Sequence, residues 1–208
     1  MPLHVKLAFI YHVESDLPGA RDATKAFVDF AEHHSSGQLA LRAEFIPVDF
    51  GPGHEFFGFW DGSGQSGGTY GPFPLTQDLK KLRDELQPTG MFRVYRHDLT
   101  DQWMQKNGKG SLAKPNAFAV TWNFPPPYTA VPWDIWQAQM KNSGEPPENI
   151  FIHEYLHQLD NMFKFKGVHN FMQPHQGVDK YDDAFRQLQD GSAVPWQKLH
   201  GVLNAHWV

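Results

Sequence analysis

The segment from Pro146 to Lys164 restricts the fold of this chain more than any other, because its residues repeat with the period of a helix. Prolines at 146 and 147 are compatible with the first turn of a helix. One side of the predicted helix is apolar and consists of Ile152, Leu156, Leu159 and Phe163, widened by Phe151 and Tyr155. The opposite side carries His153, His157, Asp160 and Lys164. The pattern therefore predicts an amphipathic helix with two histidines on its polar side.

Residues 153–157 read His-Glu-Tyr-Leu-His, and this spacing has a chemical meaning. Histidines four residues apart project side by side from a helix, so both imidazoles can bind one metal ion. Glu154, one position further round, can take a proton from a water on that ion. The H-E-x-x-H pattern is typical of zinc-dependent hydrolases. A shuffled chain of this composition gives roughly 0.03 such matches, which leaves two surface histidines on an ordinary helix as the weaker alternative.

The third metal ligand is less well defined by the sequence. A catalytic zinc ion usually has three protein ligands and one position for water. No glutamate follows Glu154, which excludes a downstream glutamate ligand, and the longer pattern H-E-x-x-H-x-x-G-x-x-H is absent. The remaining candidates are His169, His175, Asp179, Asp182, Asp183 and Asp190. For the last three we expect solvated carboxylates on a surface helix.

Residues 174–185 contain most of these candidates. His175 and Asp179 are four residues apart, so both would face one point on a helical turn. They are equal candidates for the third ligand, and the one that does not bind the metal can orient its neighbour. Tyr181 follows closely. Its phenol could donate a hydrogen bond to the oxyanion of a tetrahedral intermediate.

Asp160 lies three residues after His157 on the same side of the predicted helix. Its carboxylate could accept the second N–H of the imidazole and so fix the tautomer. The alternative is an acid that faces solvent, and the sequence leaves both open.

Strands and helices alternate outside this segment. Predicted strands cover residues 3–13, 39–48, 91–97 and 116–122, and predicted helices cover 20–34, 76–87 and 133–141. The first strand, helix and strand predict a parallel strand pair. We expect an α+β fold with a mixed sheet, in a single domain over residues 1–208. Its N-terminal β-α-β and loop-rich part would cover 1–115, and its metal-site part 116–208.

Composition excludes several classes of protein. The chain has no cysteine, so a transition metal must be held by histidines and carboxylates. The net charge of −5, without a dense Lys/Arg cluster, disfavours nucleic acid as a partner. No apolar run reaches membrane-spanning length and no signal peptide is visible, so we expect no membrane partner. The location stays open between the cytoplasm and, if a leader has been removed, the outside of the cell; the oligomeric state also stays open.

Residues 153–160, His-Glu-Tyr-Leu-His-Gln-Leu-Asp, resemble the active-site helix of zincin metallopeptidases that carry an aspartate three residues after the second histidine. Residues 177–181, Gly-Val-Asp-Lys-Tyr, are similar to the Gly-Thr-x-Asp-x-x-Tyr-Gly signature of aspzincins, with one residue fewer before the tyrosine and no final glycine. The resemblance covers about residues 149–181. It implies that His153 and His157 bind zinc, that Glu154 is the general base, and that Asp179 is the third ligand.

The resemblance also implies an architecture. In zincins a mixed sheet lies beside this helix, and its edge strand pairs with an extended substrate. Residues 116–123 precede the helix and suit that strand.

The leading hypothesis is a zinc-dependent hydrolase, a metallopeptidase that cleaves peptides or proteins with Glu154 as general base and Tyr181 at the oxyanion. The alternative is an inactive zincin-like module that binds a protein or carbohydrate partner through aromatic side chains, since the chain has 7 Trp. A hydrolase of a non-peptide amide is a third, weaker hypothesis.

Overall fold

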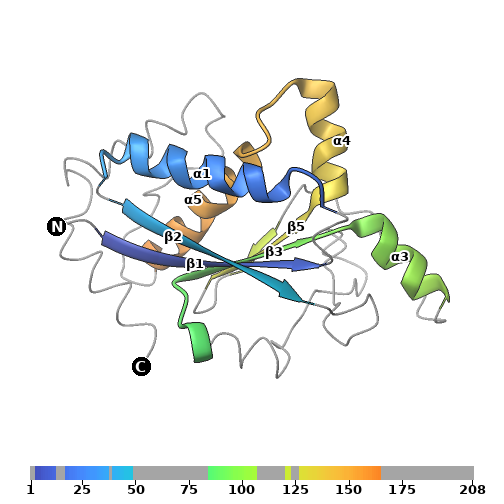
Figure 1. The fold of residues 1–208 in the computed structure, drawn as a ribbon, viewed down its shortest axis with the longest axis horizontal. Helices are drawn as coiled ribbons and strands as arrows, with labels where there is room; N and C mark the ends of the chain where they lie inside the picture. The colour runs from blue at the N-terminus through green and yellow to red at the C-terminus, as the bar shows by residue number, and fades with distance from the viewer. Residues whose placement is uncertain are drawn as a thin grey trace.

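The computed structural model describes residues 3–12, 17–37, 39–48, 84–106, 120–122 and 127–164. Within these ranges the chain forms a 5-stranded sheet in the order β2-β1-β3-β5-β4 (Figure 1). The strands are β1 (Leu3–His12), β2 (Leu39–Val48), β3 (Gly90–Tyr95), β4 (Val120–Trp122) and β5 (Tyr128–Pro132). The helices are α1 (Ala20–His34), α3 (His97–Lys106), α4 (Trp133–Ser143) and α5 (Asn149–Lys164).

The sheet is mixed, as predicted. β2, β1, β3 and β5 run parallel, and β4 pairs antiparallel with β5 at one end. The parallel pair of the N-terminal β-α-β unit is confirmed, with Leu3 opposite Leu39 and Phe9 opposite Phe45. The predicted α+β class holds only in the coarser sense of mixed helix and sheet. The helices alternate with parallel strands, as in α/β proteins, and are not segregated from the sheet.

β1 lies between two parallel neighbours, and its sequence has the continuous apolar character of a strand covered on both faces. Val5, Leu7 and Phe9 are buried on one face, and Ala8 and Ile10 are buried on the other. The core therefore extends to both sides of the sheet.

α1 and α5 lie beside the sheet (Figure 1), and aromatic side chains join both helices to the same face of it. Phe9 of β1 stacks on Phe92 of β3, with ring centroids 4.9 Å apart. Phe27 of α1 contacts Phe9 at 6.4 Å and Tyr155 of α5 at 5.4 Å, both edge to face. Such pairs contribute roughly 0.5–1.5 kcal/mol each beyond the area that they bury. This aromatic cluster fixes which side of α5 faces the core.

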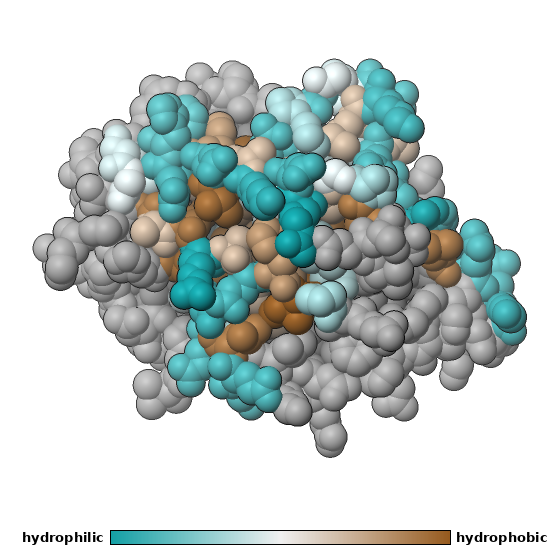
Figure 2. Space-filling model, in the orientation of Figure 1, coloured by the Kyte–Doolittle hydropathy of each residue, from teal (hydrophilic) through white to brown (hydrophobic). Residues whose placement is uncertain are grey.

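The outward side of α1 is polar and includes the exposed residues Asp22, Lys25 and Asp29. Figure 2 shows polar side chains gathered along this helix, with apolar side chains between it and the strands. Half-buried apolar residues packed against the core there include Phe30 and Phe45. None of the helices in the described ranges has both the length and the hydrophobicity that a membrane span needs.

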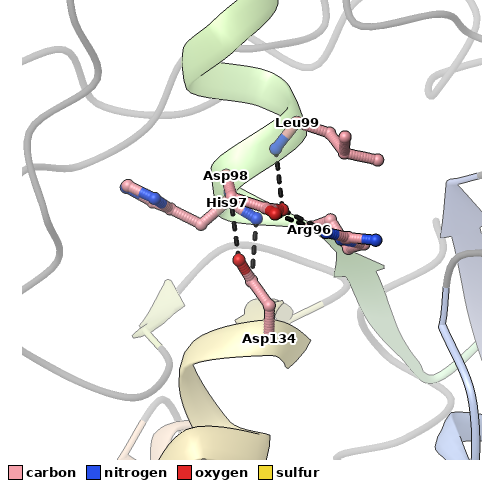
Figure 3. Close-up of polar contacts among 5 residues, drawn as sticks. All are labelled: Arg96, His97, Asp98, Leu99 and Asp134. Atoms are coloured by element: carbon pink, nitrogen blue, oxygen red, sulfur yellow. Dashed lines mark hydrogen bonds and ion pairs between the residues drawn. The ribbon is translucent and has the colours of Figure 1, made fainter.

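A polar cluster caps the start of α3 (Figure 3). The Asp134 carboxylate of α4 accepts hydrogen bonds from the backbone N–H groups of His97 at 2.8 Å and Asp98 at 3.0 Å. Arg96 forms an ion pair with Asp98 and lowers the pKa of that carboxyl through its hydrogen bond. These contacts satisfy the first turn of the helix, so we interpret the cluster as structural.

Several predicted bounds differ from those observed. The strand predicted over 91–97 ends at Tyr95, because α3 begins at His97. Of the helix predicted over 76–87, residues 84–87 are described; residues 84–86 are helical and Gln87 is not. Of the strand predicted over 116–122, residues 120–122 are described and form β4. β5 and α3 were not predicted.

Gly90, the first residue of β3, allows α5 to approach the sheet closely. A Cβ atom at this position would lie 2.3 Å from Gln158 Oε1 and 3.0 Å from Leu7 Cδ2. The Gln158 amide is held in place because its Nε2 donates to Met91 O at 3.2 Å and to Thr129 Oγ1 at 2.8 Å. A side chain at residue 90 would therefore displace Gln158 from these bonds.

We predict that Gly90→Ala destabilises the protein by about 1–3 kcal/mol, the usual cost of overpacking a core. Urea unfolding would measure this loss. Because the clash is with Gln158, the double variant Gly90→Ala/Gln158→Ala should lose less than the sum of the two single losses. Additive losses would contradict this explanation.

Candidate metal site

α5 begins at Asn149, so Pro146 and Pro147 precede the helix and do not lie in its first turn as predicted. The first turn closes through the Phe151 N–H, which donates to Glu148 O at 3.0 Å. The predicted apolar side is confirmed for Phe151, Ile152, Tyr155, Leu156 and Leu159, all of which are buried. The other side is more enclosed than the pattern predicts, since the polar residues Glu154, Gln158 and Asp160 are also buried.

His153 and His157 lie side by side and are both half-buried. Their Nε2 atoms are 3.2 Å apart, and their ring centroids are 4.9 Å apart. The two rings thus point their outer nitrogens at each other on a side of α5 that solvent reaches. The predicted side-by-side placement is confirmed.

This separation fits a shared zinc ion. Ligand nitrogens about 2.0–2.1 Å from a tetrahedral zinc ion stand roughly 3.3–3.4 Å apart, close to the 3.2 Å between the two Nε2 atoms. The same separation suits an N–H···N hydrogen bond between two neutral imidazoles. A metal ion binding here would replace that single proton without a large movement of either ring.

Glu154 lies on the buried side of the pair and is 4% exposed. Its Oε2 accepts a short hydrogen bond from Thr121 Oγ1 of β4. Burial raises the pKa of the carboxyl from its ordinary 4.5 to about 7, against the opposing effect of the Thr121 hydrogen bond. A carboxyl group with a pKa near neutrality can both accept and return a proton at physiological pH.

The predicted third ligand lies outside the described residues. His169, His175 and Asp179 are in this part of the chain, as is Tyr181, so their roles stay predictions. Within the described ranges, no group of three His, Asp or Glu side chains forms a metal site. The two histidines of α5 are therefore the part of the proposed centre that can be described.

Asp160 is 6% exposed. The alternative that it faces solvent is therefore wrong. Its predicted hydrogen bond to the His157 imidazole stays a prediction.

Thr121 is the contact that sequence reasoning missed. It belongs to a predicted strand, but nothing in the sequence indicates that its hydroxyl meets Glu154, which lies 33 residues further along the chain. Comparisons with models of known families, with curated proteins and with solved structures found no match to this chain. The function therefore has to be inferred from the geometry of the site itself.

We predict that the purified chain binds zinc and that His153→Ala or His157→Ala lowers the affinity more than about 100-fold. Removal of a residue that only hydrogen-bonds a metal ligand already lowers metal affinity about 10–100-fold, and removal of the ligand itself should lower it more. Titration of zinc against a chromophoric chelator would measure the affinity of each variant. His33→Ala is the control, because His33 is an exposed histidine on α1. Equal affinity in all three variants would contradict a site on α5.

The raised pKa of Glu154 also predicts a pH-dependent stability of the metal-free protein. Below pH 4.5 the carboxyl is protonated in both the folded and the unfolded chain, so it carries no penalty. Between pH 4.5 and about 7 the unfolded chain loses this proton while the folded chain keeps it, so the folded state loses stability over this range, and the loss is complete above about 7. The full loss corresponds to roughly 3 kcal/mol.

We therefore predict that Glu154→Gln stabilises the metal-free protein by about 3 kcal/mol at pH 8 and by little at pH 4. Urea unfolding in the presence of a chelator, repeated across this pH range for both proteins, would measure the difference. A difference that does not change with pH would contradict burial of an ionisable Glu154.

Proposed function

We propose that this chain is a zinc-dependent metallopeptidase of the zincin type. The observation that carries the proposal is the pair of Nε2 atoms 3.2 Å apart on a half-buried side of α5, with a buried carboxylate on the residue between them. In this arrangement two imidazole nitrogens and a proton acceptor lie within about one turn and a half of helix. These are the parts that hydrolysis by an activated water requires.

His153 and His157 would hold the ion, and we propose His175 or Asp179 as the third ligand. A bound zinc ion supplies Lewis acidity, which makes a water molecule a nucleophile at neutral pH. The residues fit zinc, because the chain has no cysteine and imidazole suits this metal.

Glu154 would be the general base. A base is effective when its pKa lies near the working pH, since it must take a proton in one step and return it in another. Burial gives the Glu154 carboxyl a pKa of about 7. We propose that it accepts the proton of the attacking water and later delivers a proton to the leaving amine, while Tyr181 hydrogen-bonds the oxyanion.

The position of β4 supports a peptide as the substrate. Among the described strands, β4 is at the end of the sheet, and its Thr121 touches Glu154. An extended peptide that added a strand next to β4 would gain main-chain hydrogen bonds. Its backbone would then pass close to the general base, which agrees with the edge strand that the resemblance implies.

The alternative of an inactive binding module finds less support in the two tryptophans whose side chains are described. Trp133 and Trp136 are 1% and 4% exposed. Their indole N–H groups donate to Pro18 O at 3.0 Å and to Pro147 O at 2.9 Å. Both rings therefore stabilise the fold and are not available to a partner.

We predict that Glu154→Gln retains zinc but loses hydrolysis of casein or of a quenched fluorescent peptide library by about 100-fold or more, the contribution of general base catalysis. Glu148→Gln is the matched control, because Glu148 is half-buried just before the same helix and lies outside the proposed centre. Full activity of Glu154→Gln would contradict the general-base role. Failure of the zinc-loaded wild-type chain to cleave either substrate would contradict the peptidase.

A further inference from the structure

We propose that Thr121 is a positioning residue for Glu154, held in its turn by Thr129 and Gln158. The catalytic part of this inference rests on the proposed function. The hydrogen bonds that carry it do not, because they belong to the chain without metal or substrate.

Four side chains form a continuous line of hydrogen bonds from Gln158 of α5, across two strands of the sheet, to the Glu154 carboxylate. Gln158 Nε2 donates to Met91 O at 3.2 Å and to Thr129 Oγ1 at 2.8 Å. Thr129 Oγ1 lies 2.7 Å from Thr121 Oγ1, and Thr121 Oγ1 bonds Glu154 Oε2. The line begins and ends on α5 and passes through β5 and β4.

The hydrogen bonds of this line can all be assigned the same direction, with each group donating to the next from Gln158 to Glu154. The Gln158 nitrogen has two protons, and both are used, one on a backbone carbonyl and one on Thr129. A hydroxyl has one proton, so Thr129 gives its own to Thr121, and Thr121 gives its own to the carboxylate. In the opposite direction Thr129 would accept twice, and its proton would need a further acceptor.

This direction makes Oε2 of Glu154 a hydrogen-bond acceptor and leaves Oε1 as the oxygen that can serve a water beside the histidines. It also fixes the rotation of the carboxylate. Groups that transfer protons need positions accurate to a fraction of an ångström, and sheet residues provide such rigidity better than loops do.

The two threonines are suited to this role by their place in the sheet. Thr121 and Thr129 are directly opposite each other in the antiparallel pair of β4 and β5, so their side chains lie on one face. Thr129 is fully buried and Thr121 is half-buried. The hydroxyl that touches Glu154 is thus carried by the same strand that we propose to bind the peptide, on the face that turns toward α5.

Three variants separate positioning from a merely structural role. Thr121→Val keeps the shape and removes the hydroxyl, whereas Thr121→Ser keeps the hydroxyl. Thr24→Val is the matched control, because Thr24 is a buried threonine of α1 whose hydroxyl bonds Tyr11 at 2.7 Å and Ala20 O at 2.9 Å. All three would be assayed as the zinc-loaded 208-residue chain with a fluorescent peptide substrate.

We expect Thr121→Val to lower kcat about tenfold or more, since hydrogen bonds to charged groups are the strong ones, with KM and zinc affinity unchanged. Thr121→Ser should restore kcat to within about twofold of the wild-type value, because it donates the same bond. Thr24→Val should lose thermal stability and keep its kcat. A Thr121→Val protein with wild-type kcat, or a Thr121→Ser protein no better than Thr121→Val, would overturn the inference.

A second readout needs no activity. In metal-free protein labelled at threonine, the hydroxyl protons of Thr121 and Thr129 should exchange slowly enough to give separate NMR signals, with a cross-peak between them. Thr121→Val should shift or remove the Thr129 signal, and Thr24→Val should leave it unchanged. Hydroxyl protons that exchange as fast as those of exposed threonines would overturn the hydrogen-bonded line itself.

The two readouts together tell the failures apart. Protected hydroxyl protons in a wild-type chain that cleaves nothing would refute the proposed function and the catalytic part of the inference, while the positioning of the carboxylate stands. An active wild-type chain with an equally active Thr121→Val variant would refute the inference and leave the proposed function standing.

Discussion

The contact of α5 with the aromatic core decides where every polar side chain of this helix points. Phe151 and Tyr155 pack among the rings of β1, β3 and α1, and Leu159 is buried on the same side. With 3.6 residues per turn, burial of this side turns His153 and His157 toward a half-buried surface. Glu154 falls between the two sides and meets the edge of the sheet at Thr121. The candidate site thus depends on the same contacts that stabilise the fold.

Polar groups under α5 come at a cost to stability. Glu154, Gln158 and Asp160 are all less than a tenth exposed, and burial of a carboxylate disfavours its charged form. The Thr121 hydroxyl offsets part of that cost at Glu154. Among the residues that the structure describes, the buried Oε1 of Gln158 has no hydrogen-bond partner, and it lies next to the space that Gly90 leaves open. An interface chosen for stability alone would use apolar residues here, so this concentration of polar groups supports a functional role.

The sequence predicts those helices and strands whose own residues carry a clear helical or strand pattern. α1 at 20–34 and β2 at 39–48 have the predicted bounds, because helical period and apolar continuity mark their ends. β5 was not predicted, because its five residues follow three prolines and carry no clear strand pattern of their own. This segment is a strand because it pairs with β3 and β4, and a local pattern does not show such pairing. The His-Glu-Tyr-Leu-His segment is local, so the ligand pair could be predicted. The bonds from Thr121 to Glu154 and from Gln158 to Met91 span 33 and 67 residues, and one sequence does not reveal such pairings.

The central claim is that His153 and His157 bind one zinc ion through their Nε2 atoms, and anomalous diffraction from zinc-soaked crystals tests it most directly. Data collected on both sides of the zinc absorption edge would locate the metal. The account predicts an anomalous peak about 2.0–2.1 Å from both Nε2 atoms, with these two atoms close to their present separation of 3.2 Å. A zinc ion bound elsewhere, with the two imidazoles still hydrogen-bonded to each other, would contradict it.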